Sequence, residues 1–113
     1  MNSVTIGIAS TEDVRARIAA ALRGEAQGQF ISFPSVDLLW KVLTSKRWDI
    51  LKVMTGAGAL TIREIARRAG RDVKAVHGDI HALLDAGLLT KSEDGKVVFP
   101  FDSVHVDFTL AAA

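Results

Sequence analysis

The sequence predicts a mixed α+β fold, and three observations point to it. Alternating apolar residues indicate short strands near both ends of the 113-residue chain. Between these ends, apolar residues recur every three or four positions, which is typical of amphipathic helices. Capping residues and glycines divide this central stretch into several short helices. We expect one domain with a real core, because 49% of the residues are hydrophobic and 24% are charged.

Residues 1–33 predict a small β-α-β extension. The alternation of Val4, Ile6 and Ile8 with Thr5 and Gly7 indicates a strand with one buried face. A helix is then expected from an N-cap at Thr11 to about Leu22, and a second short strand from Gln29 to Phe33. This helix is expected to bury four apolar side chains: Val14, Ile18, Ala21 and Leu22. We assign this extension and the last strand of the chain to dimerisation, because their apolar strands need a partner sheet edge that a second subunit could supply.

Two further helices are expected before residue 56. Pro34 and Ser35 open a helix from Val36 to about Leu43, and Thr44 is the expected N-cap of the next one. The first is expected to direct four side chains inward: Leu38, Leu39, Val42 and Leu43. Trp40 and Trp48 occupy apolar helical positions, so we expect core packing rather than a ligand cage or a base-stacking platform.

The segment from Thr61 to Leu89 is the most informative part of the chain. Thr61 and Glu64 have the spacing of a reciprocal capping box at the start of a short helix. Gly70 can end that helix in the left-handed conformation, and Asp72 is a good N-cap for the next. Two helices separated by such a turn predict a helix-turn-helix unit.

The second helix, from about Val73 to Ala86, divides into two faces at 100° per residue. Its expected buried stripe consists of Val73, Val76, Ile80, Leu83 and Leu84, and its exposed side carries Lys74, Ala75, Gly78 and Ala82. Small and basic residues on an exposed helix face suit entry into the major groove of DNA. Gly78 has two open interpretations: a tolerated surface glycine, or close approach to DNA or to another helix.

A hairpin is expected directly after this helix, with strands at Leu88–Lys91 and Lys96–Phe99 around an Asp-Gly turn. A hairpin in this place is the wing of a winged helix-turn-helix, which we assign to residues 34–110. The acidic tip argues against deep insertion into DNA, but Lys91 and Lys96 could contact phosphates. A final alternating strand is expected at Ser103–Leu110, followed by a tail at residues 111–113.

Three stretches resemble a known family: "LLWKVLTSKRWDILKVM", "LTIREIARRAGRDVKAVHGDIHALLDAGLL" and "DGKVVFPFDSVHVDFTL". They are similar to prokaryotic predicted transcriptional regulators with a MarR/ArsR-like winged helix, often described as antitoxin-like. The resemblance covers about Phe33 to Leu110. It implies sequence-specific binding of double-stranded DNA as a homodimer, and its antitoxin-like members extend the expectation to autoregulation and a toxin protein as partner.

Charge is unevenly distributed along the chain. Residues 44–91 carry nine basic and five acidic side chains, a net charge of +4, whereas the remainder carries −3. Such segregation favours one basic face that meets a polyanion. Lys46 and Arg47 are either phosphate anchors or an ordinary solvated helix end. The expected DNA-binding residues are Arg63, Arg67, Arg68, Arg71, Lys74, Ala75, Gly78, His81, Lys91 and Lys96.

Other functions have less support. His77 and His81 have the spacing of a metal-binding pair, but we expect a semi-buried ring and a surface hydrogen bond, since two histidines leave a zinc shell incomplete. No nucleophile, base and orienting group occur together, so no enzyme and no cofactor are expected. The absence of cysteine and of long apolar runs favours a cytoplasmic protein without a membrane partner. The alternative is a winged-helix interaction scaffold that does not bind DNA.

Overall fold

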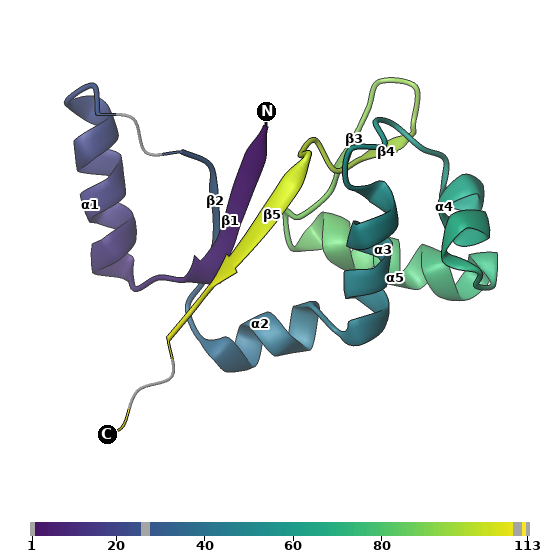
Figure 1. The fold of residues 1–113 in the computed structure, drawn as a ribbon, viewed down its shortest axis with the longest axis horizontal. Coiled ribbons are helices and arrows are strands. Elements are labelled where there is room, and N and C mark those ends of the chain that lie inside the picture. Colours follow the sequence, from purple (N-terminus) through teal and green to yellow (C-terminus); the bar gives the residue numbers. More distant parts are fainter. Residues whose placement is uncertain (1, 26–27, 110–111, 113) are drawn as a thin grey trace.

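The computed structural model describes residues 2–25, 28–109 and 112 of the chain, and these residues form a mixed α+β fold. Figure 1 shows a sheet of β1, β2 and β5 with α1 on one side and the other helices on the opposite side. No helix of the described ranges is long and apolar enough to cross a membrane. The elements are β1 (Ser3–Ile8), α1 (Thr11–Leu22), β2 (Phe30–Phe33), α2 (Val36–Val42), α3 (Ser45–Met54), α4 (Ile62–Ala69), α5 (Val73–Asp85), β3 (Thr90–Lys91), β4 (Val97–Val98) and β5 (Ser103–Asp107).

The sheet has the order β2-β1-β5, and β1 pairs in parallel with both neighbours. Its pairing with β2 is the expected outcome of a β-α-β unit. Its pairing with β5 joins the two ends of the chain, with Ser3 opposite Ser103 and Gly7 opposite Asp107. β5 ends at Asp107, before the expected end at Leu110, which lies outside the described residues. The first 33 residues and the last strand therefore share one sheet.

One hydrophobic core joins this sheet to the helices. β1 contributes Val4 and Ile6, and β2 contributes Phe33. The same cluster contains Met54 of α3 and Phe99, which follows β4. Alternation along β1 explains the arrangement, since residues two apart point to the same face of a sheet. The N-terminal unit therefore packs into the core of the helical part.

α1 departs from the expected arrangement. Its N-cap is Ser10, which forms a reciprocal capping box with Asp13, rather than Thr11. The helix buries only Ala20, whereas Ile18 is 56% exposed and Leu22 is 84% exposed. The predicted burial of its apolar side chains is therefore wrong, because Val14, Ile18 and Ala21 line an open hollow between α1 and β2 instead of packing into the core. Arg17 lines the same hollow, donates to Ser32 (2.9 Å) and lies 4.1 Å from the centre of the Phe30 ring.

α2 buries fewer side chains than expected. Leu39 and Leu43 are buried, but Leu38 is 43% exposed and Trp40 is 54% exposed. A helix of two turns has only one side against the core. Residues four apart share a side of a helix, and here Leu39 and Leu43 lie on the side that faces the core. Core packing was therefore a wrong prediction for Trp40, whose ring lies edge-on to Phe108 with centroids 5.8 Å apart. Trp40 instead borders an apolar cavity of about 620 Å³, lined by Leu39, Trp40, Leu43, Thr44, Ser45, Trp48 and Val106.

Candidate nucleic-acid interface

Helices α4 and α5 are joined by the tight turn that the sequence predicted. Gly70 ends α4 in the left-handed conformation, with φ 66° and ψ 35°. Asp72 then caps α5, and its carboxylate accepts hydrogen bonds from the amides of Lys74 (3.1 Å) and Ala75 (3.3 Å). The glycine and the cap hold the start of α5 in a fixed position beside α4.

The start of α4 differs from the expected capping box. The Thr61 hydroxyl accepts the Glu64 amide as predicted (3.1 Å). The Glu64 carboxylate, however, pairs with Arg67 and Arg68, whose Nε atoms lie 2.9 and 3.0 Å from it. Hydrogen bonds from Arg67 and then Arg68 lower the pKa of Glu64 from 4.5 to about 2. Two arginines one turn away outcompete the helix-start amide for this carboxylate, so only half of the box forms.

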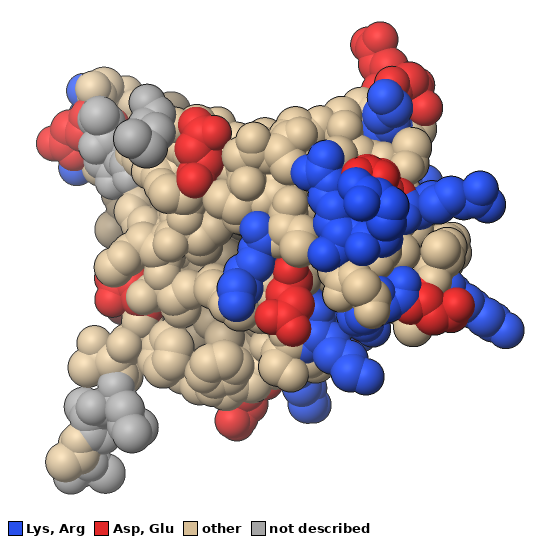
Figure 2. Space-filling view, turned by 45° about the vertical axis from the view of Figure 1, so that its right-hand side comes forward, with Lys and Arg blue, Asp and Glu red and all other residues tan. Residues whose placement is uncertain are grey.

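The exposed side of α4 remains positively charged despite this pairing. Arg63 is exposed, and the side chains of Arg67 and Arg68 are 70% and 40% exposed. The helix carries three arginines and one acid, Glu64, so its net charge is +2. Figure 2 shows Lys and Arg side chains gathered over the side of the molecule that carries α4 and α5. These arginines are free enough to reach an anion in solvent.

α5 has a buried stripe and a sparse exposed face. The fully buried side chains are Val76, Ile80 and Leu83. Val73, expected in this stripe, lies in the first turn of α5 and is 42% exposed. Ala82, expected on the exposed side, is half-buried. A Cβ at Gly78 would meet no atom within 4 Å, so no other helix of this chain explains the glycine. The exposed residues of α5 include Lys74, Ala75 and Gly78 from the expected face, and also His77 and the acidic Asp85 in its last turn.

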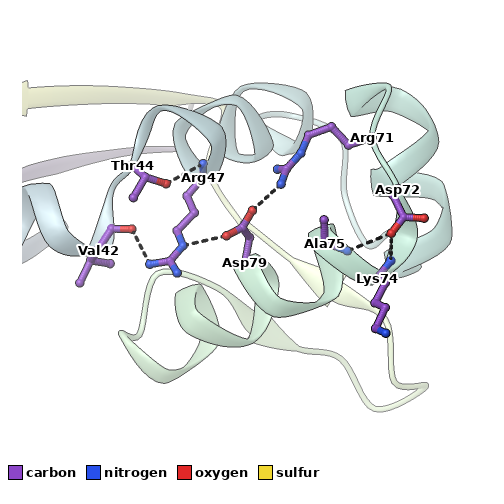
Figure 3. Close-up of polar contacts among 8 residues, drawn as sticks. All are labelled: Val42, Thr44, Arg47, Arg71, Asp72, Lys74, Ala75 and Asp79. Carbon is purple, nitrogen blue, oxygen red and sulfur yellow. Dashed lines mark hydrogen bonds and ion pairs between the residues drawn. The ribbon is translucent and has the colours of Figure 1, made fainter.

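An ion-pair bridge ties α3 to α5 and to the turn before it (Figure 3). The Asp79 carboxylate accepts from Arg47 Nε (3.1 Å) and from Arg71 Nη2 (2.8 Å). Arg47 also donates through Nη1 to the carbonyl oxygens of Val42 (3.1 Å) and Lys41 (3.4 Å). The three charged side chains of this Arg47–Asp79–Arg71 bridge are only 18–23% exposed. The bridge therefore fixes where α5 lies relative to α3.

This bridge changes the roles that the sequence suggested for its arginines. Burial alone would raise the pKa of Asp79, but hydrogen bonds from Arg71 and Arg47 and their charges lower it below 3.8. A carboxylate that stays ionised keeps both guanidinium groups in place. Arg71, expected to face DNA, is turned to Asp79, and its Nη1 is buried with no hydrogen-bond partner among the described residues. Arg47, a candidate phosphate anchor, is turned inward, whereas Lys46 is exposed.

The β3–β4 hairpin follows α5 as expected, with Thr90 opposite Val98 and Lys91 opposite Val97. Val97 also exchanges backbone hydrogen bonds with Leu60 (2.8 and 2.9 Å). The segment before α4 is thus joined to the hairpin by one antiparallel bridge. Lys91 is exposed. Lys96 is half-buried, and its amine lies 3.8 Å from Asp94 at the acidic tip. Of the two lysines, Lys91 is the better placed to meet an anion.

The two histidines of α5 lie differently from the sequence prediction. His77, expected near the buried stripe, is exposed, and His81 is half-buried. Their Nε2 atoms are 3.1 Å apart, which is the distance of a hydrogen bond between the rings. A hydrogen bond at this position was expected, but a direct bond between the two histidines was not. Within the described ranges, no group of three or more His, Cys, Asp or Glu side chains could hold a metal ion.

The structure thus brings together one part of the predicted site and separates another. Lys and Arg side chains gather on the side of the molecule that carries α4 and α5 (Figure 2), and Arg63, Arg67, Arg68 and Lys74 of these helices are exposed. Arg71 is turned inward to Asp79 and Lys96 is half-buried beside Asp94, whereas Arg67 and Arg68 remain exposed although they pair with Glu64. Sequence reasoning missed Asp79, although a signal was present. An acid beside Ile80 and three residues after Val76 lies next to a buried stripe, where a carboxylate needs a cationic partner.

Comparison with known proteins gives a family. A family model named HVO_A0114 matches residues 42–106, which is more than half of the chain and includes α3, α4, α5 and the hairpin. No curated protein and no solved structure matches the sequence or the fold. The match covers the helices that carry the basic residues and most of the core beneath them. The chain belongs to the HVO_A0114 family.

Proposed function

We propose that this protein is a winged helix-turn-helix regulator that binds double-stranded DNA through α4 and α5. The observation that carries the proposal is the exposed, small and basic face of α5 beside the exposed arginines of α4. A helix enters the major groove only where its outer side chains leave room for the backbone to approach. Gly78 and Ala75 leave that room, since a Cβ added at Gly78 would meet no atom within 4 Å.

Each exposed residue then has a distinct role. Lys74 reaches base edges or phosphates from the first turn of α5, and half-buried His81 lies two turns further along the same helix. Arg63, Arg67 and Arg68 hold phosphates, since the first helix of such a unit crosses the DNA backbone. Lys91 adds a phosphate contact from the hairpin. Arg71 supports DNA binding indirectly. Its guanidinium group donates to Asp79 and so positions α5, instead of pointing outward toward DNA.

We further propose that two copies bind together. One α5 offers few side chains for base recognition, so affinity has to come from phosphate contacts and from a second subunit. Two α5 helices about 34 Å apart would reach successive major grooves. The exposed apolar side of α1, with Ile18 and Leu22, is the surface we assign to the contact with the second copy. Ile18→Glu should give a monomer by sedimentation and weaken DNA binding. A dimer that persists in this variant would place the contact elsewhere.

The experiment that tests DNA binding starts from sites selected from random DNA and measures affinity over a series of salt concentrations. Affinity should fall steeply with salt, since binding releases counterions. Arg63→Ala should lower affinity and reduce the slope of log affinity against log salt by about 0.9. Lys74→Ala should also weaken binding, while Arg15→Ala, the same charge change on α1, should leave it unchanged.

A different result would favour the other class of function. Absence of salt-sensitive binding to every selected DNA would contradict the proposal and leave a winged-helix scaffold for protein partners. The acidic tip of the hairpin, with Asp94 and Glu93, is the observation that favours this second candidate.

A further inference from the structure

We propose that His77 and His81 form a binding site for a late first-row transition-metal ion on the surface of α5. The two residues are four apart on one helix, so their side chains lie one turn apart on the same side. Their Nε2 atoms are 3.1 Å apart, while the ring centroids are 4.3 Å apart. The nitrogens are therefore closer than the ring centres, and the rings converge toward a common point at their Nε2 ends.

The separation of the two nitrogens fits a shared metal ion. Histidine nitrogens bind zinc at about 2.0–2.1 Å. Two such ligands at 90–109° to each other lie about 2.9–3.4 Å apart, and the observed 3.1 Å falls within this range. The helix itself need not move, because the two nitrogens already stand at the required distance. To bind the ion, the ring that donates the hydrogen bond has to carry its proton on Nδ1 instead of Nε2, a tautomer shift through solvent, and both rings have to turn until their Nε2 lone pairs point at the ion.

The surroundings define what kind of ion can bind. Imidazole nitrogens select Cu²⁺, Ni²⁺ and Zn²⁺, with Cu²⁺ the tightest of the divalent series, whereas Mg²⁺ and Ca²⁺ prefer oxygen ligands. His77 is exposed, so water can supply the remaining ligands, and half-buried His81 holds one side of the pair in place. Asp85, one turn further on, does not join a three-residue group with them. The site is therefore an open two-histidine clamp.

This site does not rest on DNA binding, and metal titration alone tests it. The tag-free protein is titrated with Ni²⁺ and with Zn²⁺ by calorimetry, and one ion should bind per chain. Loss of either ring converts a chelate into a single ligand, so His77→Ala and His81→Ala should each weaken binding by about tenfold or more. His105→Ala removes the chain's third histidine, on β5, and should bind as tightly as the unchanged protein.

Two further measurements make the outcome decisive. In nitrogen NMR spectra, Zn²⁺ should shift the imidazole signals of His77 and His81 and leave those of His105 in place. Circular dichroism without metal should show that both alanine variants keep their fold, since alanine favours helix. Binding of unchanged affinity in His77→Ala or His81→Ala would overturn the proposal. Absence of binding at about 1 mM Ni²⁺ would overturn it too.

Discussion

Replacement of Asp79 by alanine tests the Arg47–Asp79–Arg71 bridge. The change removes two hydrogen bonds between charged groups, of 3.1 and 2.8 Å. Such bonds contribute about 1.5–3 kcal/mol each, and the lower end applies here because these side chains are about a fifth exposed. Arg47 keeps its bonds to two carbonyl oxygens. We therefore expect a loss of about 2–3 kcal/mol in the free energy of unfolding.

Urea and thermal unfolding measure this loss. For a domain of this size, each kcal/mol lowers the Tm by roughly 4–8 °C, so the midpoint should fall by about 10 °C or more. Asp85→Ala, which removes an exposed acid from the same helix, should change stability by less than about 0.5 kcal/mol. In a double-mutant cycle, Arg71→Ala should cost little once Asp79 is gone. Equal stability of Asp79→Ala and Asp85→Ala would refute the view that the bridge holds α5 in place.

Three further outcomes can be checked on α4 and α5. Glu64→Gln leaves the arginines of α4 unpaired and should strengthen DNA binding in the salt series, whereas Glu12→Gln on α1 should not; equal effects would mean that only total charge matters. The pKa of Glu64 lies near 2 in the folded protein, below its ordinary 4.5, so its stabilising effect is complete above pH 4.5 and is lost as the pH falls toward 2. Acid unfolding should therefore be less steep in Glu64→Gln over this range. Gly78→Ala should raise the free energy of unfolding by about 1 kcal/mol, since the added methyl group meets no atom within 4 Å. Unchanged DNA affinity in that variant would identify Gly78 as a tolerated surface glycine, and weaker binding would indicate close approach to DNA.

Local signals were enough to predict the elements around the candidate site. Gly70 and Asp72 fixed the turn between α4 and α5, because a left-handed residue and a side-chain cap act on their immediate neighbours. The hairpin was found from its Asp-Gly turn, since turn type and strand pairing are set within a few residues. The buried positions at Val76, Ile80 and Leu83 followed from helical periodicity.

Long-range contacts were harder to predict. Periodicity shows that a helix has an apolar side, but it does not show that Ile18 and Leu22 of α1 remain exposed. Charge counting treated Arg71 as a free cation, although Asp79, eight residues later, accepts its hydrogen bond. Asp79 lies within α5 and also pairs with Arg47 of α3, a helix whose position relative to α5 no local pattern gives. A side chain's partner depends on the assembled fold, so a residue's type predicts only the kind of contact that it can make.

The pairing of β1 with β5 also has a consequence for how the protein folds. Ser3 and Ser103 lie opposite each other, 100 positions apart in the chain. Closing a loop of that length costs entropy before the strand contacts can compensate, and such high contact order slows folding. During synthesis, one edge of β1 has no partner until nearly the whole chain has emerged. The local contacts among α3, α4 and α5 can form earlier, and the completed sheet then locks the two ends of the chain together.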